Sequence, residues 1–218
     1  MKKYLLTVAA ILVATPAFAQ DTGAQADSGT FTGVRGEVHA GYDNVFAKVI
    51  ATDSNGTSVG KGGKGGVSYG GEVGYDLAVG QQITVGAYAG LEGSSVKDCT
   101  AVFGGDEACL KAGRSITAGA RVGFKVTQPL LMYIKGGYSN ARLNVTYANG
   151  GANNFRLGRN FDGFHVGAGF EYAVTKHVYG KLDYTFTQYD NFDYAAGGDS
   201  FSANVQRSQV TAGVGFRF

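Results

Sequence analysis

Few residues of this chain are spaced for chemistry. The two cysteines, Cys99 and Cys109, lie ten positions apart in a polar, glycine-rich segment. An even pair of cysteines can form a disulfide or belong to a metal site, and the cellular compartment decides which is favoured. A metal site needs further ligands, and neither a nearby His nor a second cysteine pair accompanies this one. No metal site is therefore expected.

The segment Val59–Gly66, with the sequence VGKGGKGG, has the composition of a phosphate-binding loop. The nucleotide-binding motif, however, ends in Gly-Lys-Ser/Thr and opens a helix, and neither feature follows this segment. A flexible external loop is the favoured interpretation. Arg156 and Arg159 make a later segment basic, which can favour lipopolysaccharide phosphates, although a solvated pair of surface cations is the commoner arrangement.

The N-terminus has the three parts of a secretory signal. Met1–Lys3 is basic, an apolar run follows, and Ala17 and Ala19 form a small-residue cleavage pattern. We therefore expect residues 1–19 to be removed on export, and residues 20–30 to form a flexible lead-in to the folded domain. Export leads to an oxidising compartment, so the two cysteines are predicted to form a disulfide.

From Phe31 onward the chain alternates apolar and polar residues, which is the two-residue period of β-strands. Eight such stretches are present. In the first, Val34 and Val38 share one face, while Arg35 and Glu37 share the other. The fifth stretch, residues 132–147, changes phase near residue 140, as a β-bulge would cause.

The connections alternate between long and short. Long, polar, glycine-rich segments follow the odd-numbered stretches, at residues 44–66, 94–113, 148–160 and 190–203. The intervening links are tight, at residues 78–82, 127–129 and 175–177. Long loops at one end and short turns at the other are the layout of outer-membrane β-barrels. The sequence therefore predicts an all-β, eight-stranded, antiparallel up-and-down transmembrane barrel over residues 31–218, with four mobile loops outside the membrane.

A soluble barrel, with its apolar residues inside, is the alternative that alternation leaves open. The polar face is rich in Gly and Thr, and only 17% of all residues are charged, whereas a soluble surface carries many more Lys and Glu. Tyr and Phe also recur near the ends of the predicted strands, where the interfacial girdles of membrane barrels lie. We therefore expect the apolar face to contact lipid.

Several short motifs carry a family resemblance. Gly70–Tyr75 (GGEVGY), Tyr133–Tyr138 (YIKGGY) and Gly163–Tyr172 (GFHVGAGFEY) resemble strands of the small opacity-type, OmpA-like "porin family" barrels of Gram-negative bacteria. The last strand resembles the β-signal read by the outer-membrane assembly machinery, through Val210, Ala212, Val214, Phe216 and Phe218. The resemblance implies a barrel in the outer membrane, with the assembly machinery and lipopolysaccharide or other outer-membrane lipids as partners.

By strand phase, six basic and six acidic residues face the barrel interior: Arg35, Arg121, Lys125, Lys135, Lys181 and Arg217 with Glu37, Glu72, Asp76, Glu92, Glu171 and Asp183. An eight-stranded barrel holds little beyond its own side chains, and buried charges persist only when they are paired. Glu37, Glu72, Arg121 and Lys135 fall nearest mid-height. Together with Arg35, they are predicted to form one ion-pair cluster that blocks continuous water.

The predicted function is that of a monomeric, non-enzymatic structural or surface-interaction protein that acts through its loops. A narrow diffusion pore for small solutes or ions is the alternative, if water wets the interior charges separately. A lipid A-modifying enzyme is the third interpretation, and it needs Ser, His and an acid together at the outer rim. His39 and His165 are predicted to point inward and His177 to lie in a short turn, so no catalytic residue and no cofactor are expected. A formal charge of +2 gives no reason to expect nucleic-acid binding.

Overall fold

The computed structural model describes residues 30–54, 56–102, 106–148, 155–196 and 199–218. The predicted signal peptide, with Ala17 and Ala19, and most of the predicted lead-in lie outside these residues. The strands are β1 (Gly33–Asp53), β2 (Gly56–Val79), β3 (Ile83–Ser94), β4 (Lys97–Val102), β5 (Asp106–Thr127), β6 (Leu130–Ala148), β7 (Phe155–Ala173), β8 (Val178–Tyr189), β9 (Phe192–Ala196) and β10 (Asp199–Arg217). Within the described residues, no helix has the length and apolar character needed to cross a membrane.

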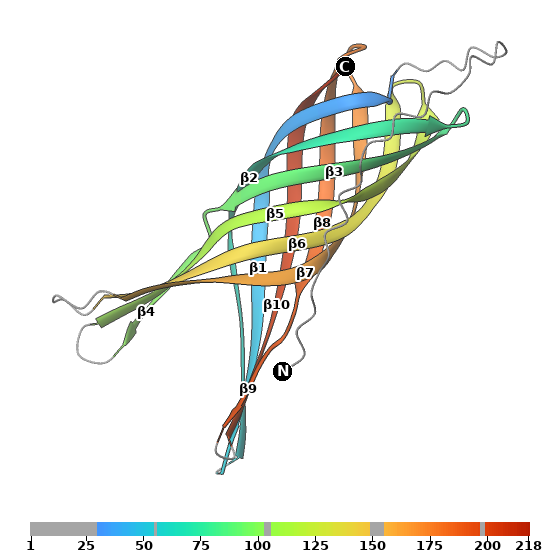
Figure 1. Ribbon diagram of the computed structural model, residues 1–218. Helices are drawn as coiled ribbons and strands as arrows, with labels where there is room; N and C mark the ends of the chain where they lie inside the picture. The colour runs from blue at the N-terminus through green and yellow to red at the C-terminus, as the bar shows by residue number, and fades with distance from the viewer. Residues whose placement is uncertain (1–29, 55, 103–105, 149–154, 197–198) are drawn as a thin grey trace, which may run out of the picture.

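Eight of the strands close into a barrel (Figure 1). They follow the order β1-β2-β3-β5-β6-β7-β8-β10, each antiparallel to its neighbours, and β10 pairs back with β1. β4 and β9 are short additional strands that pair with β5 and β10. Closure gives every strand of the ring two partners, as a barrel surrounded by lipid requires. The predicted eight-stranded up-and-down barrel is confirmed.

Where the structure describes them, the four long connections are paired β-strands, so the expectation of irregular loops was wrong. The ladder between β1 and β2 continues to the pair Asp53 and Gly56, next to the hairpin tip. Gly-rich stretches such as residues 60–66 carry few side chains, so their pairing with β1 leaves no periodic signal in the sequence. The segment VGKGGKGG accordingly belongs to strand β2 rather than to a flexible loop.

The hairpins combine into two arms that leave the same end of the barrel and diverge (Figure 1). We call the extensions of β1, β2 and β10 with β9 the first arm, and those of β5, β6 and β7 with β4 the second arm. The first arm comprises residues 44–54, 56–66, 192–196 and 199–206, and the second arm residues 97–102, 106–114, 141–148 and 155–161. The short turns lie at the opposite end of the barrel, where the sequence placed them.

The outer surface of the barrel is apolar. Val38, Val73 and Ile134 point outward and are 69%, 62% and 65% exposed. The five residues that resemble an assembly signal are all exposed. Four lie on the outward face of β10 and Phe218 follows directly after it: Val210, Ala212, Val214, Phe216 and Phe218. Because so continuous an apolar belt is suited to lipid rather than to water, the predicted facing of the strands agrees with the structure.

Candidate functional site

The barrel lumen is filled by charged side chains. Ten of them form one connected set of ion pairs, which we call the lumen network: Arg35, Glu37, Glu72, Asp76, Arg121, Lys135, Glu171, Lys181, Asp183 and Arg217. No side chain of this set is more than 10% exposed. Equal numbers of positive and negative groups make the network neutral, as burial requires.

Arg35 is the centre of the network. Its guanidinium lies 3.0 Å from Glu37 Oε2 and 2.6 Å from Glu72 Oε1. Its Nε lies 3.3 Å from Asp76 Oδ2, so three carboxylates surround one cation. Tyr179 donates a further hydrogen bond of 2.8 Å to Glu37. Arg35 therefore joins two parts of the network, one at mid-height and one nearer the short turns.

The mid-height part is a closed ring of ion pairs. Lys181 contacts Glu37 and lies 3.5 Å from Asp183. Lys135 lies 2.8 Å from the same Asp183 carboxylate and 4.0 Å from Glu72, which returns the ring to Arg35. Tyr133 donates a 2.8 Å hydrogen bond to Asp183. The lumen is thus crossed at this height by side chains that contact one another.

The second part of the network lies nearer the short turns. Arg121 holds Asp76 through Nε at 2.8 Å and Nη2 at 2.5 Å, and its Nη1 contacts Glu171. Arg217 bridges the same two acids, at 3.0 Å from Asp76 and 2.8 Å from Glu171. Arg121, bidentate on Asp76, and the bridging Arg217 thus share two carboxylates, an arrangement that fixes all four side chains.

All five predicted cluster residues belong to the lumen network, and four of them, Arg35, Glu37, Glu72 and Lys135, lie in its mid-height ring. Arg121 differs, because its ion-pair partners are Asp76 and Glu171. Arg121 and Lys135 are direct partners across β5 and β6, and like charges in that position repel. The two cations accordingly extend to different acids. Strand phase shows which residues face the lumen, but it does not show toward which acid a long side chain extends.

Glycines opposite the large side chains make room for the network. Gly215 lies opposite Tyr179, and an added Cβ there would come within 2.1 Å of the Tyr179 ring. A Cβ at Gly119 would lie 2.7 Å from the Tyr88 hydroxyl oxygen. Much of the high glycine content of the sequence therefore reflects a narrow lumen packed with long side chains.

A third charge group lies in the lumen next to the arms. Arg207 donates two 2.8 Å hydrogen bonds to Asp43, and Ser94 donates another of 2.6 Å. Arg207 also lies 3.4 Å from Glu92. Sequence analysis missed Asp43 because it ended the first strand too early, and it missed Arg207 because it began the last strand too late. Asp43 and Arg207 stand at odd positions, like the inward residues Arg35 and Arg217 of the same strands. Extending the two predicted strands toward the arms would therefore have identified both.

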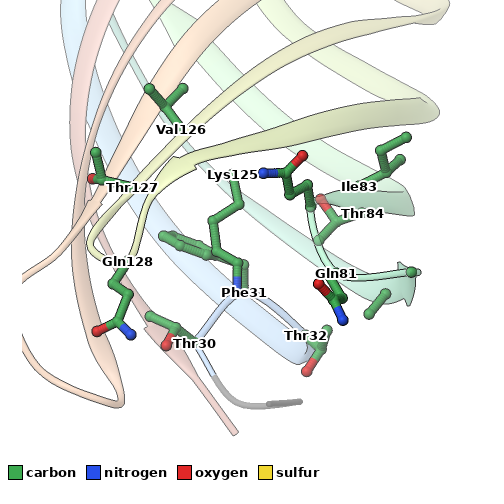
Figure 2. Close-up of a pocket in the computed structure, with 13 residues that line it drawn as sticks. Thr30, Phe31, Thr32, Gln81, Ile83, Thr84, Lys125, Val126, Thr127 and Gln128 are labelled. Atoms are coloured by element: carbon green, nitrogen blue, oxygen red, sulfur yellow. The ribbon is translucent and has the colours of Figure 1, made fainter. Parts of the chain in front are cut away.

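At the short-turn end, Phe31 lies buried at the edge of the lumen. It is 4% exposed, and the Arg217 guanidinium lies 5.8 Å from the centre of its ring. Phe31 and Lys125 both line a pocket of about 490 Å³ (Figure 2). Lys125, one of the twelve charges predicted to face inward, thus lies at the mouth of the barrel beside Phe31.

Among the described residues, no histidine contacts both a serine and a carboxylate. His165 bonds Ser139 through Nδ1 at 2.8 Å and Tyr88 through Nε2 at 2.5 Å, and Ser139 is 1% exposed. Sequence analysis did not identify Ser139 as a partner. His39 lies inside the lumen between two carboxylates, and His177 lies in the turn before β8. Both ring nitrogens of His165 have hydrogen-bond partners inside the barrel. Tyr88, Ser139 and His165 therefore form an arrangement suited to holding neighbouring strands together.

The second arm contains the predicted disulfide. Cys99 on β4 and Cys109 on β5 are direct register partners, and their sulfur atoms are bonded. The prediction is confirmed. Of the two arginines predicted to make a loop basic, Arg159 lies on β7 in the same arm, whereas the Arg156 side chain lies outside the described part of the structure.

Comparison with known proteins gives a consistent result. The sequence model of the family described as "Outer membrane protein beta-barrel domain" matches residues 5–218. The 25 kDa outer-membrane immunogenic protein of Brucella canis is 27% identical over 109 residues, which are 50% of this chain and 48% of that protein. This chain thus matches about half the length of that relative.

Shorter or more distant similarities were also found. The 22 kDa outer membrane protein of Rhizobium leguminosarum bv. viciae is 38% identical over 56 residues, 26% of each chain. Among solved structures, the attachment invasion locus protein Ail of Yersinia pestis aligns with 83% of this chain and 99% of its own, at 10% identity and a TM-score of 0.45.

Proposed function

The chain belongs to the outer membrane protein β-barrel domain family, and on this premise we propose that it is a closed, non-enzymatic surface protein that acts through its two arms. Barrels of this membrane carry their long connections outside the cell and their short turns in the periplasm. The arms would therefore extend from the cell surface. The Brucella relative is named immunogenic, and the same exposure of surface segments to the outside is proposed for this chain.

The lumen network is the observation that carries the proposal. An eight-stranded barrel is wide enough only for its own side chains, and here ten mutually paired charges occupy it. A narrow diffusion pore, the alternative, requires a continuous file of water through this set. The network supports a closed barrel over a pore. His165, whose two ring nitrogens are both engaged, supports a role without catalysis.

Pairs of facing lysines favour an anionic partner for the arms. Lys48 and Lys61 are direct partners across β1 and β2 in the first arm, and Lys97 and Lys111 across β4 and β5 in the second. Like charges directly opposite each other weaken a β-ladder. Phosphate groups of the surrounding lipopolysaccharide would neutralise both pairs. We therefore include lipopolysaccharide among the proposed partners, for a monomer inserted by the outer-membrane assembly machinery.

Vesicles test this proposal. Full-length mature protein is folded into phosphatidylcholine vesicles with lipopolysaccharide, or with lipopolysaccharide whose phosphates have been removed. We expect the phosphorylated form to raise the melting temperature of the wild type, and the quadruple variant Lys48→Gln/Lys61→Gln/Lys97→Gln/Lys111→Gln to lose this increase. Lys176→Gln, in a short turn, is the control and should retain the increase. If the wild type has the same melting temperature with both forms of lipopolysaccharide, the proposal that its phosphates bind the arms is wrong.

A further inference from the structure

A cavity of about 510 Å³ lies between the two arms. The first arm contributes Val45, Val49 and Val205 to its walls, and the second arm contributes Leu143 and Phe161. Small-molecule sites typically have volumes of about 300–1,000 Å³ and mainly apolar walls. The cavity therefore has the size and lining of a ligand site, and it is separate from the lumen network.

The apolar lining results from a change along the inward face of the strands. On β1, Asp43 is the last inward charge of the barrel, and Val45 and Val49 continue on the same face. On β10, Arg207 is followed toward the arm by inward Val205. The buried pair of Asp43 and Arg207 thus separates a charged lumen from an apolar cleft. The inward side chains of β1 and β10 thus change from charged to apolar where the barrel ends.

The phase change near residue 140 has the same origin, and the predicted bulge in that strand was wrong. β6 pairs with β7 without interruption through Asn140, while the irregularity lies in β5, between Ala112 and Ser115. Leu143 consequently keeps the inward phase of Lys135 and lines the cleft. The change of phase near residue 140 therefore marks the place where the inward residues of β6 become apolar.

Charge restricts the kind of ligand. Among the described residues that line the cleft, Lys64 and Arg159 are cationic and none is acidic. Lys64 belongs to β2 in the first arm and Arg159 to β7 in the second, so one anionic group between them would contact both arms. Apolar walls with one cation on each side complement an acyl chain that ends in an anion.

We propose that this inter-arm cleft binds a single-chain amphiphile with an anionic headgroup, of the long-chain fatty acid class. The acyl chain packs between Val45 and Leu143, over Phe161, and the carboxylate lies between Lys64 and Arg159. The ligand joins the two arms. This site does not require that the outer lysine pairs bind lipopolysaccharide, so the two proposals can fail independently.

Binding of 11-(dansylamino)undecanoic acid tests the proposal, with full-length mature protein folded into phosphatidylcholine vesicles. We expect a saturable rise in dansyl fluorescence above that of protein-free vesicles. Lys64→Gln/Arg159→Gln should raise the Kd about tenfold, as the loss of charge-assisted hydrogen bonds predicts. The same double change should leave the Kd of the uncharged methyl ester of the probe unaltered.

Leu143→Asp tests the apolar wall and should abolish binding. Ile50→Asp is the matched control, because Ile50 lies on the first arm but outside the cleft lining. Heat-modifiable migration on gels shows that each variant is folded, and the double cation variant remains informative if Leu143→Asp does not fold. No saturable binding by the wild type, equal losses in both Asp variants, or equal Kd values for the acid and its ester would overturn the proposal.

Discussion

Arg35 and Arg217 are direct partners across β1 and β10, where the barrel closes, and both lie within ion-pair distance of Asp76. Asp76 Oδ2 lies 3.3 Å from Arg35 Nε and 3.0 Å from Arg217 Nη1. Two like charges in this position would weaken the ladder that joins the first and last barrel strands. A carboxylate from β2 thus makes the closing pair of strands compatible with two buried arginines.

Asp76→Asn should therefore destabilise the barrel. The change removes the carboxylate charge that Arg35, Arg121 and Arg217 share. Removing one partner of a buried ion pair costs about 3–5 kcal/mol of unfolding free energy. Urea unfolding in vesicles measures the loss of unfolding free energy. Asp190→Asn, at an exposed position near the arms, is the control. If both variants unfold at the wild-type urea concentration, Asp76 does not hold the strands together.

Val122→Arg tests which face of the strands contacts lipid. Val122 points outward near the middle of the barrel part of β5, residues 115–127, and is 46% exposed. An Arg at the bilayer midplane costs about 2–4 kcal/mol in membrane barrels, so the variant should fold poorly into vesicles. Val59→Arg makes the same change on the first arm, outside the bilayer, and should fold normally. Normal folding of Val122→Arg would reverse the assigned facing.

Gly215→Ala tests the space that glycine leaves for the lumen network. The added methyl would overlap the Tyr179 ring, at 2.1 Å, and displace a side chain that donates a hydrogen bond to Glu37. Overpacking of this kind costs about 1–3 kcal/mol. Gly180→Ala adds a methyl whose nearest neighbouring atom is 4.0 Å away, so its unfolding free energy should stay near that of the wild type. Equal stability of the two variants would contradict the packing argument.

Cys99→Ser/Cys109→Ser should loosen the second arm and leave the barrel intact. The disulfide closes a small loop between paired strands, for which a stabilisation of about 2–3 kcal/mol is expected. Limited proteolysis should cut the arm faster in the double variant, while the barrel core keeps its heat-modifiable migration. Unchanged cleavage of the arm would show that strand pairing alone protects it.

Much of the barrel could be predicted from the sequence because alternation determines both strand and facing. Val38 and Ile134 are exposed on the outside, and Glu37 and Lys135 are inside, as their parity requires. The cysteine pair was also predictable, since export and an even count leave few alternatives.

The arms and the details of the network were not predictable for separate reasons. Gly-rich segments such as residues 60–66 show no alternation even when their backbone is paired. The first strand was ended too early and the last strand was begun too late, which hid Asp43 and Arg207. The direction of Arg121 depends on repulsion from Lys135 in the next strand, and that relation exists only once the register is known.

Conductance across a planar bilayer tests the central claim, a lumen closed by paired charges, most directly. Mature wild-type protein is predicted to give no steady current. Glu72→Ala removes an ion-pair partner of Arg35 and Lys135 and should open a small, flickering conductance or lower the melting temperature. Lys125→Ala, at the mouth of the barrel, should behave as the wild type. A steady wild-type current that Glu72→Ala leaves unchanged, together with an unchanged melting temperature, would contradict the closed barrel and establish a pore.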